Sequence, residues 1–149
     1  MNRATPQMRS FAKRLLATEI AGMRPGEAAD ATLFPVTDKL RPHLTLLMGK
    51  GGVRALLARA LVLASAEMPW LSAAQVNANG DLDGLEALAV GLDPTEFFEC
   101  RVVLLAQLLG LLVAFIGPNL TSRLIGEVWP QVPLKERDFG KENDREKGK

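Results

Sequence analysis

Apolar residues recur three and four positions apart over the first twenty residues, which is the spacing of one face of an α-helix. Thr5 suits the N-cap, Pro6 suits the first helical position, and Gly22 suits the end. The sequence therefore predicts an amphipathic first helix over about residues 5–22. The positions expected to face the core are Met8, Phe11, Ala12, Leu15, Leu16 and Ile20.

A glycine-rich stretch at residues 49–52 interrupts the next helical pattern. We expect a second helix over Asp38–Met48, ended by Gly49 in a left-handed conformation, and a third helix over about Gly52–Glu67. Lys50 among these glycines invites comparison with a phosphate-binding loop. The first glycine and the Ser/Thr that such a loop needs are both missing, so we interpret the stretch as a turn between helices.

The third expected helix carries apolar residues on more than one side. Most of them share one face, but Val62 falls opposite that face. We therefore expect this helix to be buried around most of its circumference. Arg59 lies at the margin of the apolar sector and is expected to be half-buried beside a carboxylate.

The longest stretch without helical periodicity is Met68–Gly84, whose many turn-forming residues predict the main loop. From Asn79 onward, the amide and acidic side chains have the spacing of the first ligands of a calcium-binding loop. Val90, however, stands at the twelfth position, where a bidentate glutamate is required. We therefore favour a turn in which Asp83 caps a short helix that runs through Val90.

One segment, Val102–Ile116, is apolar around its whole circumference, and Gln107 is its only polar side chain. Asp93 with Glu96 predicts a capped helix start ahead of it. Fifteen helical residues rise about 22 Å, less than the roughly 30 Å of bilayer hydrocarbon. We therefore predict the covered central helix of a bundle and no membrane span.

A last helix is expected over Pro118–Trp129. Together these elements predict an all-α fold: a single-domain bundle of five or six helices around the central hydrophobic helix, over residues 1–130. A disordered, charged C-terminal tail is expected over residues 131–149. Trp70 and Trp129, at expected helix ends, are predicted to anchor those ends in the core; an exposed tryptophan would instead suit contact with a partner.

Composition agrees with a helical fold, because 48% of the residues are hydrophobic, few are aromatic and none is tyrosine. The net charge of +1 conceals an uneven distribution. Residues 1–60 carry ten basic and four acidic side chains, whereas residues 61–130 carry two basic and eight acidic ones. We expect the two parts to complement each other, within one chain or between copies; a basic surface for an acidic partner is the alternative.

The chain offers few residues for catalysis or metal binding. One histidine, His43, and one cysteine, Cys100, cannot build a histidine- or cysteine-rich zinc site, and no motif marks a nucleophile. A single cysteine also excludes an internal disulfide, and no signal peptide is recognisable, so a cytoplasmic location is expected. We expect no metal, no cofactor and no enzymatic activity; only carboxylate-based chemistry is left open.

By exclusion, the sequence favours a small non-catalytic helical protein-interaction or assembly module, which binds a protein partner or forms a homo-oligomer. The first alternative is a nucleic-acid-binding regulator that uses the basic N-terminal part. The second is a peripheral membrane protein that uses the amphipathic first helix. The predicted contact surface consists of charged residues: Arg9, Lys13, Arg14, Arg54, Arg59, Glu96 and Glu99.

Overall fold

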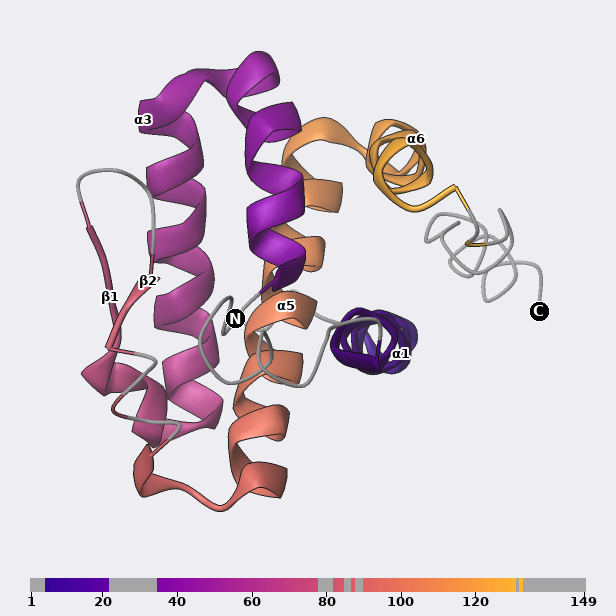
Figure 1. The fold of residues 1–149 in the computed structure, drawn as a ribbon. Helices are drawn as coiled ribbons and strands as arrows, with labels where there is room; N and C mark the ends of the chain where they lie inside the picture. The colour runs from indigo at the N-terminus through magenta and orange to yellow at the C-terminus, as the bar shows by residue number, and fades with distance from the viewer. Residues whose placement is uncertain are drawn as a thin grey trace, which may run out of the picture.

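The computed structural model of the chain describes residues 5–21, 35–77, 82–84, 87, 90–130 and 132. This part of the chain is mostly helical, as predicted, but it holds four helices where five or six were expected. The helices are α1 (Pro6–Ala21), α3 (Pro35–Glu67), α5 (Pro94–Ile116) and α6 (Pro118–Val128) (Figure 1). The predicted charged tail and most of the short helix expected after Asp83 lie outside the described residues.

The first helix begins where the sequence predicts. Pro6 opens α1, and the Thr5 hydroxyl accepts a hydrogen bond from the Met8 backbone N–H at 3.1 Å. This bond satisfies one of the amide donors that the first helical turn leaves unpaired. Of the six expected core positions, five are buried, and the side chain of Ile20 lies outside the description.

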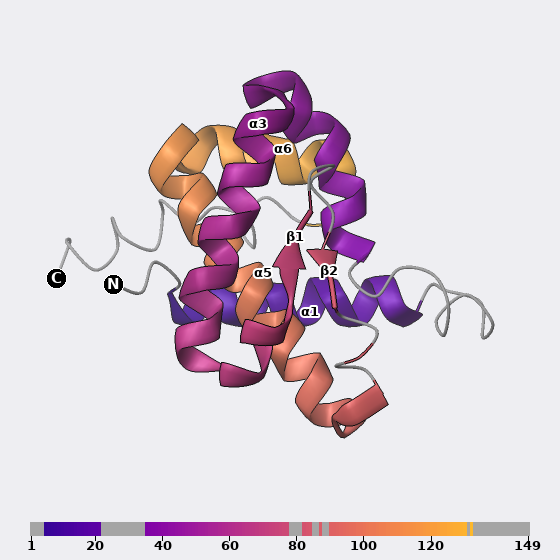
Figure 2. The ribbon, with the colours of Figure 1, turned by 90° about the vertical axis from the view of Figure 1, so that its left-hand side faces the viewer.

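Helix α3 consists of two helical segments, residues 35–48 and 50–67, joined at Gly49. This residue has φ 77° and ψ 166°, a conformation that is open to glycine almost alone. Figures 1 and 2 show that the chain reverses there and that the two segments lie side by side. The predicted break at Gly49 is therefore confirmed. The first segment starts at Pro35, earlier than the predicted Asp38, and continues through Pro42.

The region expected to be a loop contains more structure than predicted. A 3₁₀ helix, η1 (Pro69–Ala73), is followed by strand β1 (Gln75–Val76), which pairs antiparallel with β2 (Leu82–Asp83). Gly84 follows with φ 96°, and a Cβ there would lie 2.8 Å from the Ala73 carbonyl oxygen. Only two residues of each strand pair. So short a strand shows no detectable alternation of apolar and polar residues, and the sequence therefore could not reveal this hairpin.

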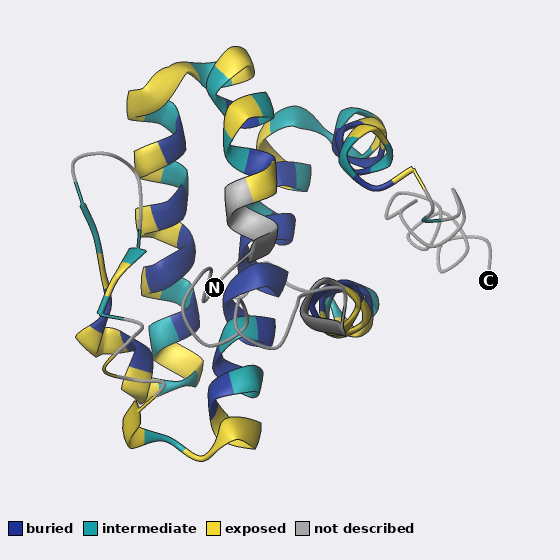
Figure 3. Ribbon diagram, in the orientation of Figure 1, coloured by how far each residue is buried: buried dark blue, intermediate teal, exposed yellow. Residues whose placement is uncertain are grey.

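Helix α5 is the centre of the core. Every residue from Val102 to Gly110 is buried, including Gln107. The two segments of α3 run alongside α5, whereas α1 and α6 lie across it; α1 is seen end-on in Figure 1 and lengthwise in Figure 2. Figure 3 shows that the buried sides of these helices face one another.

The predictions for Asp93 at the start of α5 and for the two tryptophans agree with the structure only in part. Asp93 occupies the N-cap position of α5, as predicted, but its side chain makes no capping hydrogen bond. Trp129, which follows α6, is 1% exposed and anchors that helix end in the core. Trp70 in η1 is 44% exposed, so its predicted anchoring role is wrong.

Candidate interaction surface

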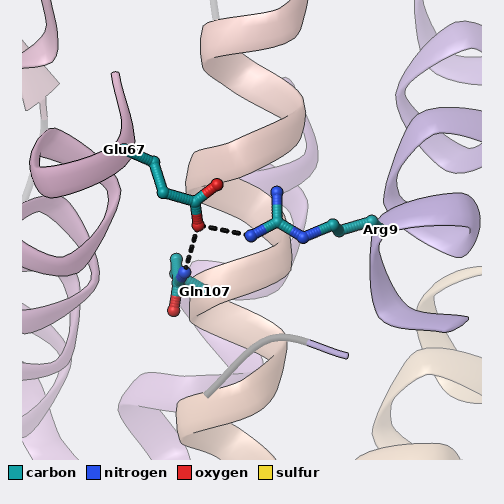
Figure 4. Close-up of polar contacts among 3 residues, drawn as sticks. All are labelled: Arg9, Glu67 and Gln107. Carbon is teal, nitrogen blue, oxygen red and sulfur yellow. Dashed lines mark hydrogen bonds and ion pairs between the residues drawn. The ribbon is translucent and has the colours of Figure 1, made fainter. Parts of the chain in front are cut away.

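Three helices meet at a polar cluster formed by Arg9 of α1, Glu67 of α3 and Gln107 of α5 (Figure 4). The Arg9 guanidinium donates to the Glu67 carboxylate, and the Gln107 side-chain amide donates to the same carboxylate oxygen at 3.0 Å. The side chains of Arg9 and Glu67 are 31% and 33% exposed, whereas Gln107 is 1% exposed. Glu67 therefore supplies the acceptor that a buried amide in an apolar helix needs.

This cluster joins the basic and acidic parts of the chain, since Arg9 belongs to residues 1–60 and Glu67 to residues 61–130. A second contact between these parts places His43 Nδ1 of α3 3.9 Å from Glu127 Oε1 of α6. Gln107 was predicted to be the one polar residue of its segment, but its partner Glu67 was not predicted. The requirement that a buried amide be hydrogen-bonded was the available signal.

Burial shifts the pKa values of two side chains near the start of α5. Burial raises the pKa of the Cys100 thiol, and the nearby carboxylates of Glu96 and Glu99 raise it further. A thiol of raised pKa that is 0% exposed is a poor nucleophile. Burial lowers the pKa of Arg101, whose guanidinium carbon lies 4.5 Å from the centre of the Phe97 ring.

The second segment of α3 has an exposed side that is apolar except for Arg59, contrary to prediction. Val62 is 63% exposed, and Ala55, Ala58 and Ala66 are also exposed. We call these four residues the outer face. Helix α3 contacts η1, β1, α1 and α6 as well as α5, yet the described part of the chain leaves Val62 mostly exposed. Figure 3 shows the exposed side of this segment turned away from α5. The expectation that this helix is buried around most of its circumference is therefore wrong.

A groove of about 440 Å³ adjoins the outer face. It separates the second segment of α3 from the last turns of α5, and Phe115 at its edge is 68% exposed. Arg59 is exposed in this groove, whereas it was expected to be half-buried. It was also expected to lie beside a carboxylate, but no described carboxylate forms an ion pair with it. We call it the α3–α5 groove; its lining residues are Gly52, Ala55, Leu56, Arg59, Leu111, Ala114 and Phe115.

A smaller groove, of about 230 Å³, lies between the first segment of α3 and α6. Leu46 and Leu47 at its edge are 88% and 47% exposed. Its lining includes Arg123, Glu127 and His43, so it is more polar than the α3–α5 groove.

The seven residues of the predicted contact surface do not form one patch. Arg54 and Arg59 lie near the C-terminal end of α5, whereas Glu96 and Glu99 are in its first two turns, about 20 Å away along the helix. Arg9 is engaged by Glu67. On α1, Lys13 and Arg14 have exposed side chains. Arg59 is thus the member that lines the α3–α5 groove, and Arg54 is exposed at the same end of the second segment of α3, next to Ala55.

Neither metal binding nor a membrane span receives strong support. Within the described residues, no three His, Cys, Asp or Glu side chains come together as a metal site.

Helix α5 has 23 residues, more than the 15 apolar ones counted from sequence, and is long and apolar enough to cross a membrane. The expectation that this helix is too short to span a bilayer is therefore wrong. Within the bundle, 61% of the most apolar 18-residue stretch of α5 is buried, which is also typical of a core helix.

Comparisons with protein-family models, with curated proteins and with solved structures give no match for this chain.

Proposed function

We propose that this protein is a non-catalytic helical module that binds another protein, and that the α3–α5 groove with the adjacent outer face is its contact surface. The observation that supports this most directly is the open apolar groove of about 440 Å³ beside an exposed phenylalanine, Phe115. Protein partners commonly insert a large apolar side chain into such a hollow, because the water displaced from it favours binding.

The chemistry of the groove fits binding better than catalysis. Arg59 is the only titratable residue among those that line it. A guanidinium keeps its proton at any practical pH, so it cannot act as a general acid or base. It can, however, orient a carboxylate of a partner through paired hydrogen bonds.

Photo-crosslinking in cells that express the protein tests this proposal. A benzophenone amino acid placed at Ala58 or Phe115 should form discrete crosslinks to protein. The matched control places it at Ala17, an exposed alanine of α1. Crosslinks identified by mass spectrometry at the two surface positions and absent at Ala17 are the expected result; equal or no labelling at all three positions contradicts the proposal.

A peripheral membrane protein is the second candidate, because three large apolar side chains are exposed near one end of the molecule. These are Leu46, Leu47 and Phe115, with Lys50 in the turn between the segments of α3. Apolar side chains beside basic ones favour anionic lipid surfaces. Flotation with vesicles of phosphatidylcholine and 30% phosphatidylserine, compared with phosphatidylcholine alone, would reveal this binding, and Leu46→Ser should abolish it.

A further inference from the structure

The outer face continues the apolar surface of the α3–α5 groove along the second segment of α3. Its members are spaced by three, four and four residues, so they lie on one side of the helix. Ala55 belongs to both surfaces. The groove and the outer face therefore form one continuous strip.

The dimensions of this strip suit a helix. Ala55 and Ala66 are eleven residues apart, which corresponds to about 16 Å, or three helical turns. Three of the four outer-face residues are alanines, and small side chains let two helix axes approach to about 8 Å. A partner helix of three to four turns could cover the strip while a larger residue at one of its ends fills the groove beside Leu56 and Phe115.

Two charged residues, Arg59 in the strip and Arg54 beside it, select the chemistry of that helix. Arg54 and Arg59 are exposed, and neither forms an ion pair with any residue that the structure describes. No residue of the groove or the outer face is acidic. At the far end of the segment, Glu67 is already engaged by Arg9 and Gln107. A complementary partner must therefore bring carboxylates to the end of the strip near Arg54 and Arg59.

A second copy of this chain does not meet that requirement through a symmetric contact. Two-fold symmetry centred on the strip would bring the same patch of both copies together. If the two helices run antiparallel, the end with Arg54 and Arg59 lies opposite the Glu67 end of the other copy, and Glu67 is already engaged by Arg9 and Gln107. If they run parallel, the arginines of the two copies face each other, and like charges in an interface oppose association.

We propose that the partner segment is an acidic amphipathic helix, with one large apolar residue for the α3–α5 groove and carboxylates for Arg54 and Arg59. This inference rests on the proposed function, because it specifies what the same surface binds. It follows from the combination of a bare small-residue helix face, an apolar groove and two arginines that no described carboxylate neutralises.

Selection from a phage-displayed library tests the inference. The library consists of 16-residue peptides randomised at every position, and the target is the folded full-length chain. Peptides are then tested against Ala58→Gln, which blocks close approach to the outer face without changing charge. We expect enriched peptides that bind this variant at least tenfold more weakly, carry clustered Asp and Glu, and lose affinity as salt rises.

Charge reversal provides the sharper measurement. Arg59→Glu should weaken these peptides at least tenfold, whereas Arg123→Glu, the same change on α6, should leave their affinity within twofold. Peptides that are sensitive to Ala58→Gln but basic or uncharged would overturn the acidic-helix inference and leave the proposed function standing. Failure to enrich any peptide that is sensitive to Ala58→Gln would count against the proposed function itself.

Discussion

The middle of α5 and the second segment of α3 are both rich in leucine and other apolar residues, yet their surroundings differ. From Val102 to Gly110, α5 is buried on every side, because α1, α3 and α6 all pack against it. The second segment of α3 packs against α5 and leaves Val62 63% exposed on its other side. Apolar composition thus shows that a helix can be covered, whereas the number of neighbouring helices decides whether it is.

The largest expected effect is a loss of stability in α5, and it is measured against the same type of substitution on α3. Leu108→Ala in α5 removes a side chain that is 0% exposed and should lower the free energy of unfolding by about 2–5 kcal/mol. Val62→Ala on the outer face should change it by less than about 0.5 kcal/mol. Urea unfolding followed by circular dichroism measures both. A large loss for Val62→Ala would mean that the outer face is covered in the isolated protein.

The next effect concerns the turn that places the second segment of α3 beside the core. Gly49→Ala should cost about 1–3 kcal/mol, since a Cβ meets no atom within 4 Å there and the penalty comes from the backbone conformation alone. Gly51→Ala, also with open space around its Cβ, should be neutral or stabilise by about 0.5 kcal/mol. Equal effects of the two substitutions in thermal unfolding would contradict the turn geometry.

The polar cluster at the other end of the segment should contribute less. Glu67→Ala deprives the buried Gln107 amide of its carboxylate acceptor and should cost about 1–2 kcal/mol. Glu67→Gln keeps an oxygen acceptor and should cost less than half as much, because the ion pair with Arg9 is about one-third exposed and therefore weak. Both variants lose the ion pair, so the loss of each relative to the unmutated protein should be larger at low salt than at high salt. Identical losses at 0.05 and 0.5 M NaCl would assign the stabilisation to the hydrogen bond alone.

The smallest expected effect tests the enclosure of α5 through pH. The pKa of Cys100 is raised in the folded protein, so the thiol favours the folded state fully below its unfolded pKa of about 8.5, and this contribution is lost as pH rises through the folded pKa. Stability should therefore fall more steeply between pH 8.5 and 10 than in Cys100→Ala, by at most about 1.4 kcal/mol per pH unit. Parallel pH curves for the two proteins would show that the thiol is not enclosed. The chain has no tyrosine that would titrate in the same range.

Much of the local structure could be predicted because it depends on neighbours in the chain. Thr5 and Pro6 specify the start of α1 through one capping bond and one fixed dihedral angle. Gly49 marks the reversal within α3 because few other residues adopt its backbone conformation. The β1–β2 hairpin escaped prediction, since two paired residues on each strand leave no detectable alternation.

The candidate site was predictable only in part. Arg54 and Arg59 were expected in the contact surface; Arg59 lines the α3–α5 groove, and Arg54 is exposed at the same end of the second segment of α3. Glu96 and Glu99 were expected to complement them, but the length of α5 keeps the two pairs apart. Phe115 lies in a run of apolar residues whose members look alike in sequence, so its exposure could not be foreseen.

The sequence by itself determined that this chain forms helices, where several of them begin and end, and that its most apolar helix occupies the centre. These properties depend on interactions within a few residues, which a linear pattern records. Tertiary structure alone decided which apolar side of α3 stays open and which arginine is engaged, because both depend on how helices distant in sequence pack together. The proposed contact surface consists of what that packing leaves uncovered.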